Sequence, residues 1–121
     1  MTDLLKLENI DKEGCKFIVN EINSQPILWQ ETYRAILTRE KQISAFLDTV
    51  LGIEGLQIIL TGAGSSAFIG EILSQSFYIN TGKSTKAIPT TDLVTHPAGH
   101  FDRKTPTLLI SFARSGNSPE S

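Results

Sequence analysis

Two short loops contain most of the side chains suited to binding an anion. The first runs from Gly62 to Ser66 and ends in two serines, and the second runs from Arg114 to Ser118 and holds two more. Each loop follows an apolar run, 57–60 in one case and 107–112 in the other. Glycine lets backbone N–H groups approach an anion, and a helix N-terminus favours negative charge. This pattern predicts one oxyanion site shared by both loops.

Phosphate fits these loops because each of its oxygens needs hydrogen-bond donors, and ligands of parallel sheets bind at the carboxyl ends of strands. Arg114 is the one cation of the set, so neutral donors and a helix end would hold most of the charge. We therefore predict a compact phosphomonoester rather than a polyanion. The predicted phosphate-binding residues are Gly64, Ser65, Ser66, Arg114, Ser115, Asn117 and Ser118.

Two other interpretations of the loops compete with a phosphomonoester site. Gly62, Gly64 and Ala67 match the variant dinucleotide fingerprint G-x-G-x-x-A, but the next strand ends in Pro89 rather than in the acidic residue that a ribose needs. No G-x-x-x-x-G-K-[ST] occurs, which excludes a P-loop. On the residues alone, it also stays open that both loops are simply polar turns.

Helices are expected before the first loop. A short helix from Gly14 should stop near Gln25, because Pro26 disfavours helical geometry in the residue before it. Apolar residues at steps of three and four then predict a long amphipathic helix from Trp29 to Leu51, ended by Gly52. Its apolar stripe is expected to pack on the sheet or on a second subunit.

Strands and helices alternate in the rest of the chain. Residues 57–60 predict a strand, and the helix after the first loop should end at 80–82. A second strand is expected at 86–89, near an edge because of Pro89, and a short helix capped by Thr90, Thr91 or Asp92 should be broken by Pro97 and Gly99. With a third strand at 107–112, this order predicts an α/β class with a parallel sheet.

The composition limits the possible partners. The chain has 121 residues, 40% of them hydrophobic, and a net charge of −2 from 11 basic and 13 acidic residues. Such a balance predicts no binding to nucleic acid or membrane, and the start of the chain lacks the apolar stretch of a signal peptide, so we expect a cytoplasmic protein. Cys15 is alone, and the two histidines, His96 and His100, have no neighbouring cluster of ligands. We therefore expect no metal site and no cofactor.

The sequence also predicts local structure at the two ends of the chain. Residues 1–13 are interpreted as an extended arm. At the other end Ser118 has N-cap chemistry, Pro119 suits the first helical position and Glu120 suits the first turn, which together predict the start of a helix. We therefore expect the sequence to be the first part of a larger protein. Its predicted division is a helical segment, 1–52, followed by the first part of a binding domain, 53–121.

Four segments resemble a known family. They are T-G-A-G-S-S (61–66), S-x-A-R-S-G-N-S-P-E-S (111–121), N-E-I-N-S-Q-P-I-L-W (20–29) and P-T-T-D-L-V-T-H-P (89–97). Together they resemble the sugar isomerase (SIS) domain, and within it the tagatose-6-phosphate ketose/aldose isomerase type, the galactosamine-6-phosphate deaminase/isomerases. One departure is Ala113-Arg114 in the second loop, where many SIS domains have a further serine.

The resemblance implies a three-layer α/β/α fold, flavodoxin-like, which is incomplete in this chain. It implies binding of a sugar phosphate by an amino-sugar or hexose phosphate isomerase or deaminase, of the type that converts galactosamine 6-phosphate to tagatose 6-phosphate and ammonia. It also implies homo-oligomers of the full-length proteins. Related enzymes carry the catalytic carboxylate and histidine later in the chain, so no catalytic residue is expected here and the fragment is expected to be inactive. The alternative is a non-catalytic SIS sugar-phosphate sensor, which would need a basic DNA-binding segment that the N-terminal arm does not provide.

Overall fold

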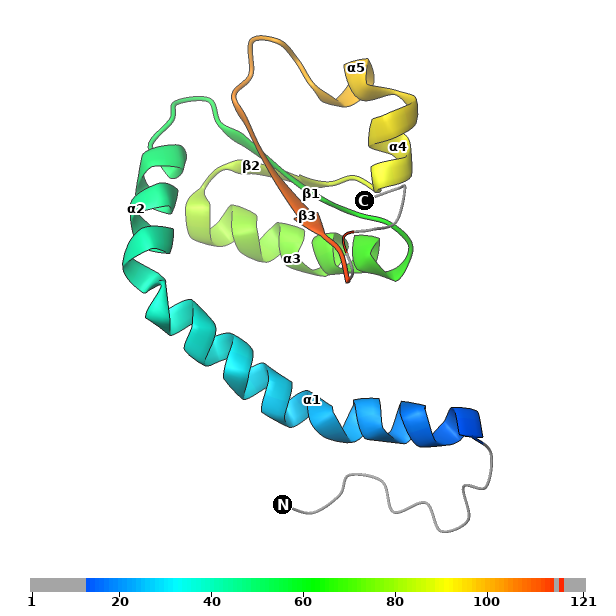
Figure 1. The fold of residues 1–121 in the computed structure, drawn as a ribbon. Helices are drawn as coiled ribbons and strands as arrows, with labels where there is room; N and C mark the ends of the chain where they lie inside the picture. The colour runs from blue at the N-terminus through cyan, green and yellow to red at the C-terminus, as the bar shows by residue number, and fades with distance from the viewer. Residues whose placement is uncertain (1–12, 115, 117–121) are drawn as a thin grey trace. The chain divides into compact units, whose positions relative to one another are not determined.

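A computed structural model of the chain describes residues 13–114 and Gly116, with side chains from Phe17 onward (Figure 1). The elements are α1 (Glu13–Thr38), α2 (Glu40–Leu51), β1 (Gln57–Gly62), α3 (Ser65–Thr81), β2 (Ser84–Ala87), α4 (Thr90–Thr95), α5 (Pro97–His100) and β3 (Thr107–Phe112). No helix in the described part of the chain is both long enough and apolar enough to cross a membrane. The predicted arm at 1–13, apart from Glu13, and the predicted helix start at Ser118 lie outside the described residues.

The three strands form one parallel sheet in the order β2-β1-β3. Gln57 at the start of β1 pairs with Ser84 and Thr107, and Gly62 at its end pairs with Phe112. Every residue of β1 is buried. In β2 half-buried and exposed residues alternate, and in β3 they alternate from its second residue onward. A strand that is buried on both faces has an almost continuous apolar sequence, so β1 can be recognised from the sequence alone.

The two faces of the sheet carry separate apolar clusters. On one face Ile58 and Leu60 pack against Leu73 and Phe77 of α3, and Val50 of α2 joins them. On the other face Ile59 packs with Ile88, Leu93 of α4 and Phe101. Figure 1 shows α3 on one side of the sheet and α4 with α5 on the other. The described part of the chain therefore has the predicted α/β/α layering. The outer strand β3 is less well covered, since its Leu109 is 47% exposed.

The prediction that a helix stops near Gln25 is wrong. α1 continues through Pro26, which lies inside it. An interior proline removes one helical hydrogen bond and usually kinks a helix, but the helix can continue beyond it. The hydroxyl of Ser24 donates to the carbonyl of Glu21 at 2.8 Å, which adds a bond in the turn before the proline.

The prediction of a single helix from Trp29 to Leu51 is also wrong, although its end at Gly52 is confirmed. The break lies at Arg39, whose N–H donates to the carbonyl of Ile36 rather than to one four residues back. Just before it, the hydroxyl of Thr38 donates to the carbonyl of Arg34 at 2.8 Å, a bond that commonly bends helices. The chain divides into two compact units, one that ends at Ser44 and one that begins at Ala45. The predicted domain limits, 1–52 and 53–121, stay a prediction.

Two smaller corrections concern the segment after α3. The second strand occupies 84–87 rather than 86–89, although the N–H of Ile88 still donates to the carbonyl of Leu60 at 2.9 Å. Pro97 and Gly99 do not simply end the short helix: Pro97 begins α5, because proline is well suited to a first helical position. No side chain caps α4, where Pro89 occupies the cap position. The strand at 107–112 is confirmed residue for residue.

Candidate functional site

The first predicted loop joins β1 to α3 by a very close turn. A Cβ atom at Gly62 would lie 2.7 Å from the carbonyl carbon and oxygen of Ser66, a distance that real Cβ atoms do not reach. Gly64 has φ 55° and ψ −128°, a conformation that is open to glycine and costly for other residues. The N–H of Ser66 donates to the carbonyl of Ala63, and that of Ala67 to Gly64, both at 3.1 Å. The loop therefore requires glycine at both positions.

Ser65 and Ser66 occupy the first turn of α3. Ser65 is exposed and Ser66 is half-buried. The first turn of α3 contains no acidic residue, and Gly64 offers no side chain to cap it. The N–H groups of a first turn have no partner within the helix, and the helix dipole favours an anion there. This end of the helix is thus suited to bind a negatively charged group.

The second predicted loop begins beside the first. Because Gly62 pairs in parallel with Phe112, both strands end on the same side of the sheet, at their carboxyl ends. Ala113 and Arg114 follow at once and are exposed, and Gly116 has φ 67°. Ser115, Asn117 and Ser118 lie outside the described residues. Of the seven predicted residues, the structure thus places Gly64, Ser65, Ser66 and Arg114 in segments that leave adjacent strand ends.

The sequence did not reveal a pair of buried hydroxyls at the same edge. Thr61, directly before Gly62, has its Oγ1 atom 3.2 Å from Oγ1 of Thr90, the first residue of α4. These threonines are 3% and 9% exposed. Their separation in sequence gives no local pattern, so only the paired strands bring them together.

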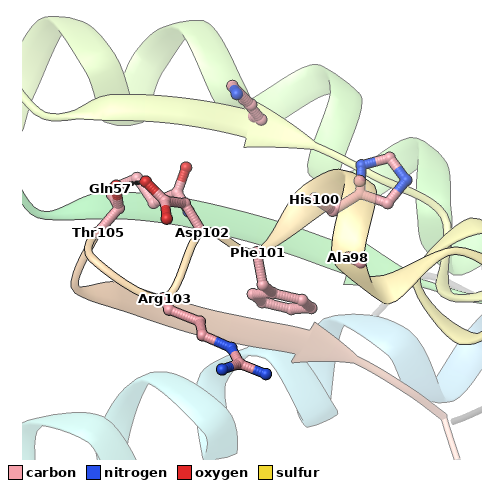
Figure 2. A pocket seen from close by; sticks show the side chains of 9 residues that line it. Gln57, Ala98, His100, Phe101, Asp102, Arg103 and Thr105 are labelled. Atoms are coloured by element: carbon pink, nitrogen blue, oxygen red, sulfur yellow. Dashed lines mark hydrogen bonds between the residues drawn. The ribbon is translucent and has the colours of Figure 1, made fainter.

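A separate cavity of about 610 Å³ lies near the starts of the strands. It is lined by Gln57 and Lys86 of the sheet and by residues 98–103 and Thr105, and it contains none of the predicted phosphate-binding residues. Figure 2 shows the side chains of Gln57, Asp102 and Thr105 near one another and that of Arg103 extending away. The carboxylate of Asp102 accepts bonds from the Lys104 N–H at 3.1 Å and the Thr105 hydroxyl at 3.2 Å. The carboxylate therefore serves a local turn.

The two histidines lie at helix ends. His96 joins α4 to α5, with its Nδ1 atom 3.1 Å from the hydroxyl of Thr95, and His100 ends α5 and lines the cavity. Among the described residues, no three side chains of His, Cys, Asp or Glu are grouped as metal ligands.

Comparison with known proteins gives clear relatives. The chain is 50% identical over 101 residues to D-galactosamine-6-phosphate deaminase AgaS of Escherichia coli O157:H7, covering 84% of this chain and 26% of that protein. It is 40% identical over 121 residues to the protein of that name from Shewanella sp. (strain ANA-3), covering 98% of this chain and 31% of the relative. No protein-family model matches the chain.

A solved structure is similar in both fold and sequence. The crystal structure of tagatose-6-phosphate ketose/aldose isomerase from Escherichia coli matches with a TM-score of 0.80 and 48% identity, over 84% of this chain and 28% of that one. The chain thus spans between a quarter and a third of the length of these relatives.

Proposed function

Since the chain belongs to the SIS-type tagatose-6-phosphate ketose/aldose isomerase family, we propose that it is the sugar-phosphate-binding part of a hexose phosphate isomerase or deaminase. The substrate class we propose is an amino-sugar or ketose phosphate such as galactosamine 6-phosphate. The names of the relatives support this class. The observation that carries the proposal is the parallel pairing of Gly62 with Phe112. Because of this pairing, both predicted loops begin at the carboxyl ends of adjacent strands.

In the proposed site the phosphate binds between the two loops. Backbone N–H groups at the start of α3 and the hydroxyls of Ser65 and Ser66 donate from one side. Arg114, Ser115, Asn117 and Ser118 donate from the other. The absence of acidic residues from the first turn of α3 and the glycine-only conformation of Gly64 support this arrangement.

The phosphate would act as an anchor rather than as a reacting group. In an aldose–ketose isomerisation a proton moves between C2 and C1. When C2 carries an amine, this shift leaves an imine at C2, and water hydrolyses the imine to the ketone with release of ammonia. Binding energy from the remote phosphate positions these carbons against an acid and a base. We propose that the acid and the base come from outside these 121 residues. The chain alone would then bind the sugar phosphate without turning it over.

Calorimetric titration of the chain with galactosamine 6-phosphate tests the binding, and galactosamine without phosphate is the control ligand. Ser66→Ala should weaken binding of the phosphate ester by about 1–3 kcal/mol, the usual cost of leaving a charged oxygen one hydrogen bond short. Ser74→Ala is a matched control further along α3, where the hydroxyl donates only to the carbonyl of Glu71. Equal affinity of both variants and of the unchanged chain would exclude Ser66 from the site.

Assays of ammonia and of ketose formation test the second half of the proposal. We expect neither product from the chain alone, because loss of general acid–base catalysis costs about 10²- to 10⁴-fold in rate and loss of positioning costs more. Turnover at a rate typical of an enzyme would show that the chain contains its own acid and base.

A further inference from the structure

The hydrogen-bonded hydroxyls of Thr61 and Thr90 lie next to the first predicted phosphate loop and have no role in the binding described above. Their Oγ1 atoms are 3.2 Å apart, and both residues are buried. Thr61 directly precedes Gly62 in β1, and Thr90 is the first residue of α4. The bond therefore joins the end of the central strand to the first residue of a helix on one face of the sheet.

The pair lies on the face of the sheet that carries an apolar cluster. Ile59, Ile88 and Leu93 form the cluster on this face of the sheet, and the N–H of Ile88 donates to the carbonyl of Leu60. Among the described residues, each threonine hydroxyl has the other as its hydrogen-bond partner. A buried hydroxyl pair adds little net stability, because both groups give up hydrogen bonds to water. Its bond is directional, however, so it fixes how the two segments lie relative to each other.

Any shift of Thr61 is transmitted directly to the loop 62–66. Gly62 lies so close to the backbone of Ser66 that even a Cβ atom does not fit between them, so a shift of the strand end must move Ser66. We propose that Thr61 and Thr90 are positioning residues, whose hydroxyl bond holds the loop 62–66 in the conformation that receives phosphate. This inference rests on the proposed function.

Two substitutions at Thr90 separate the hydroxyl from the shape of the side chain. Thr90→Val keeps the shape and removes the hydroxyl, whereas Thr90→Ser keeps the hydroxyl and removes the methyl group. Thr91→Val is the matched control, because Thr91 is the exposed neighbour. The first measurement needs no ligand: hydrogen exchange of the Ser66 and Ala67 amides, which close the loop on the carbonyls of Ala63 and Gly64. We expect about two- to tenfold faster exchange in Thr90→Val and near-unchanged exchange in Thr90→Ser and Thr91→Val.

The second measurement is the Kd for galactosamine 6-phosphate. Thr90→Val and Thr61→Val should each weaken binding by about two- to tenfold, and the double variant should be no weaker than either, because both changes remove the same bond. A role in packing alone would give the opposite pattern, with a larger effect of Thr90→Ser than of Thr90→Val, and would overturn the proposal. Unchanged exchange and unchanged Kd in Thr90→Val would overturn it as well. If the unchanged chain binds no sugar phosphate, the proposed function is wrong, and the exchange rates alone then decide whether the pair fixes the loop.

Discussion

Replacing Gly62 by alanine is a sharp test of the loop geometry, because the added methyl group has no space. Its carbon would lie 2.7 Å from the carbonyl carbon and oxygen of Ser66 and 2.9 Å from Ser66 Cβ. Two of these three atoms belong to the backbone, so no side-chain rotation relieves the contact. Overpacking of this kind costs about 1–3 kcal/mol, and we expect Gly62→Ala to lose that much stability. Since Ser66 must move, binding of a sugar phosphate should be weakened too.

Two other glycines provide controls for this substitution. A Cβ at Gly99 of α5 meets no atom within 4 Å, so Gly99→Ala should leave the stability equal or raise it by about 0.4–1 kcal/mol. A Cβ at Gly64 also meets nothing, but its φ of 55° is unfavourable for alanine. Gly64→Ala should therefore cost about 1–2 kcal/mol through the backbone alone.

Urea unfolding of the three variants, followed by circular dichroism, gives the stabilities, and titration with galactosamine 6-phosphate gives the affinities. We expect Gly62→Ala to be less stable and to bind more weakly than Gly99→Ala. A Gly62→Ala variant as stable and as tight in binding as the unchanged chain would refute the close turn between β1 and α3.

Further substitutions test the second loop, the core and α2. Ser115→Ala should weaken binding of galactosamine 6-phosphate by about 1–3 kcal/mol in a calorimetric titration, and unchanged affinity would remove Ser115 from the site. Ile59→Ala, at a residue that is 0% exposed, should cost about 2–5 kcal/mol in urea unfolding; a loss well below this range would contradict its place in the core. Leu47→Asp places a charge at a half-buried position of α2 and should lower the unfolding midpoint; a variant of full stability and helicity would show that this side of α2 faces water.

The central part of the fold could be predicted because its signals are local. The apolar run before Gly62 forms a fully buried strand, and the run at 107–112 forms a strand of half-buried and exposed residues. Glycines mark the turns that follow these strands. Their parallel order followed from the helices between them. Four of the predicted site residues, Gly64, Ser65, Ser66 and Arg114, consequently follow adjacent strand ends in the structure.

The failures of sequence reasoning have physical causes as well. The effect of Pro26 is a preference of a few kcal/mol, which a long helix can accommodate, so proline alone does not fix a helix end. The break at Arg39, where the N–H donates to the carbonyl of Ile36, follows a hydroxyl bond from Thr38 to Arg34, and neither bond can be recognised from the apolar spacing. The bond between Thr61 and Thr90 joins residues 29 positions apart, and only the assembled sheet brings them together.

The most direct test of sugar-phosphate binding is a nuclear magnetic resonance titration of the isotopically labelled chain with galactosamine 6-phosphate. We predict saturable shifts of the backbone amides of Gly64, Ser65, Ser66 and Gly116 and no comparable shifts with unphosphorylated galactosamine. Residues of the separate cavity, such as Gln57 and His100, should change little. Shifts confined to that cavity, or no saturable shift at all, would contradict the claim that the carboxyl ends of β1 and β3 bind a sugar phosphate.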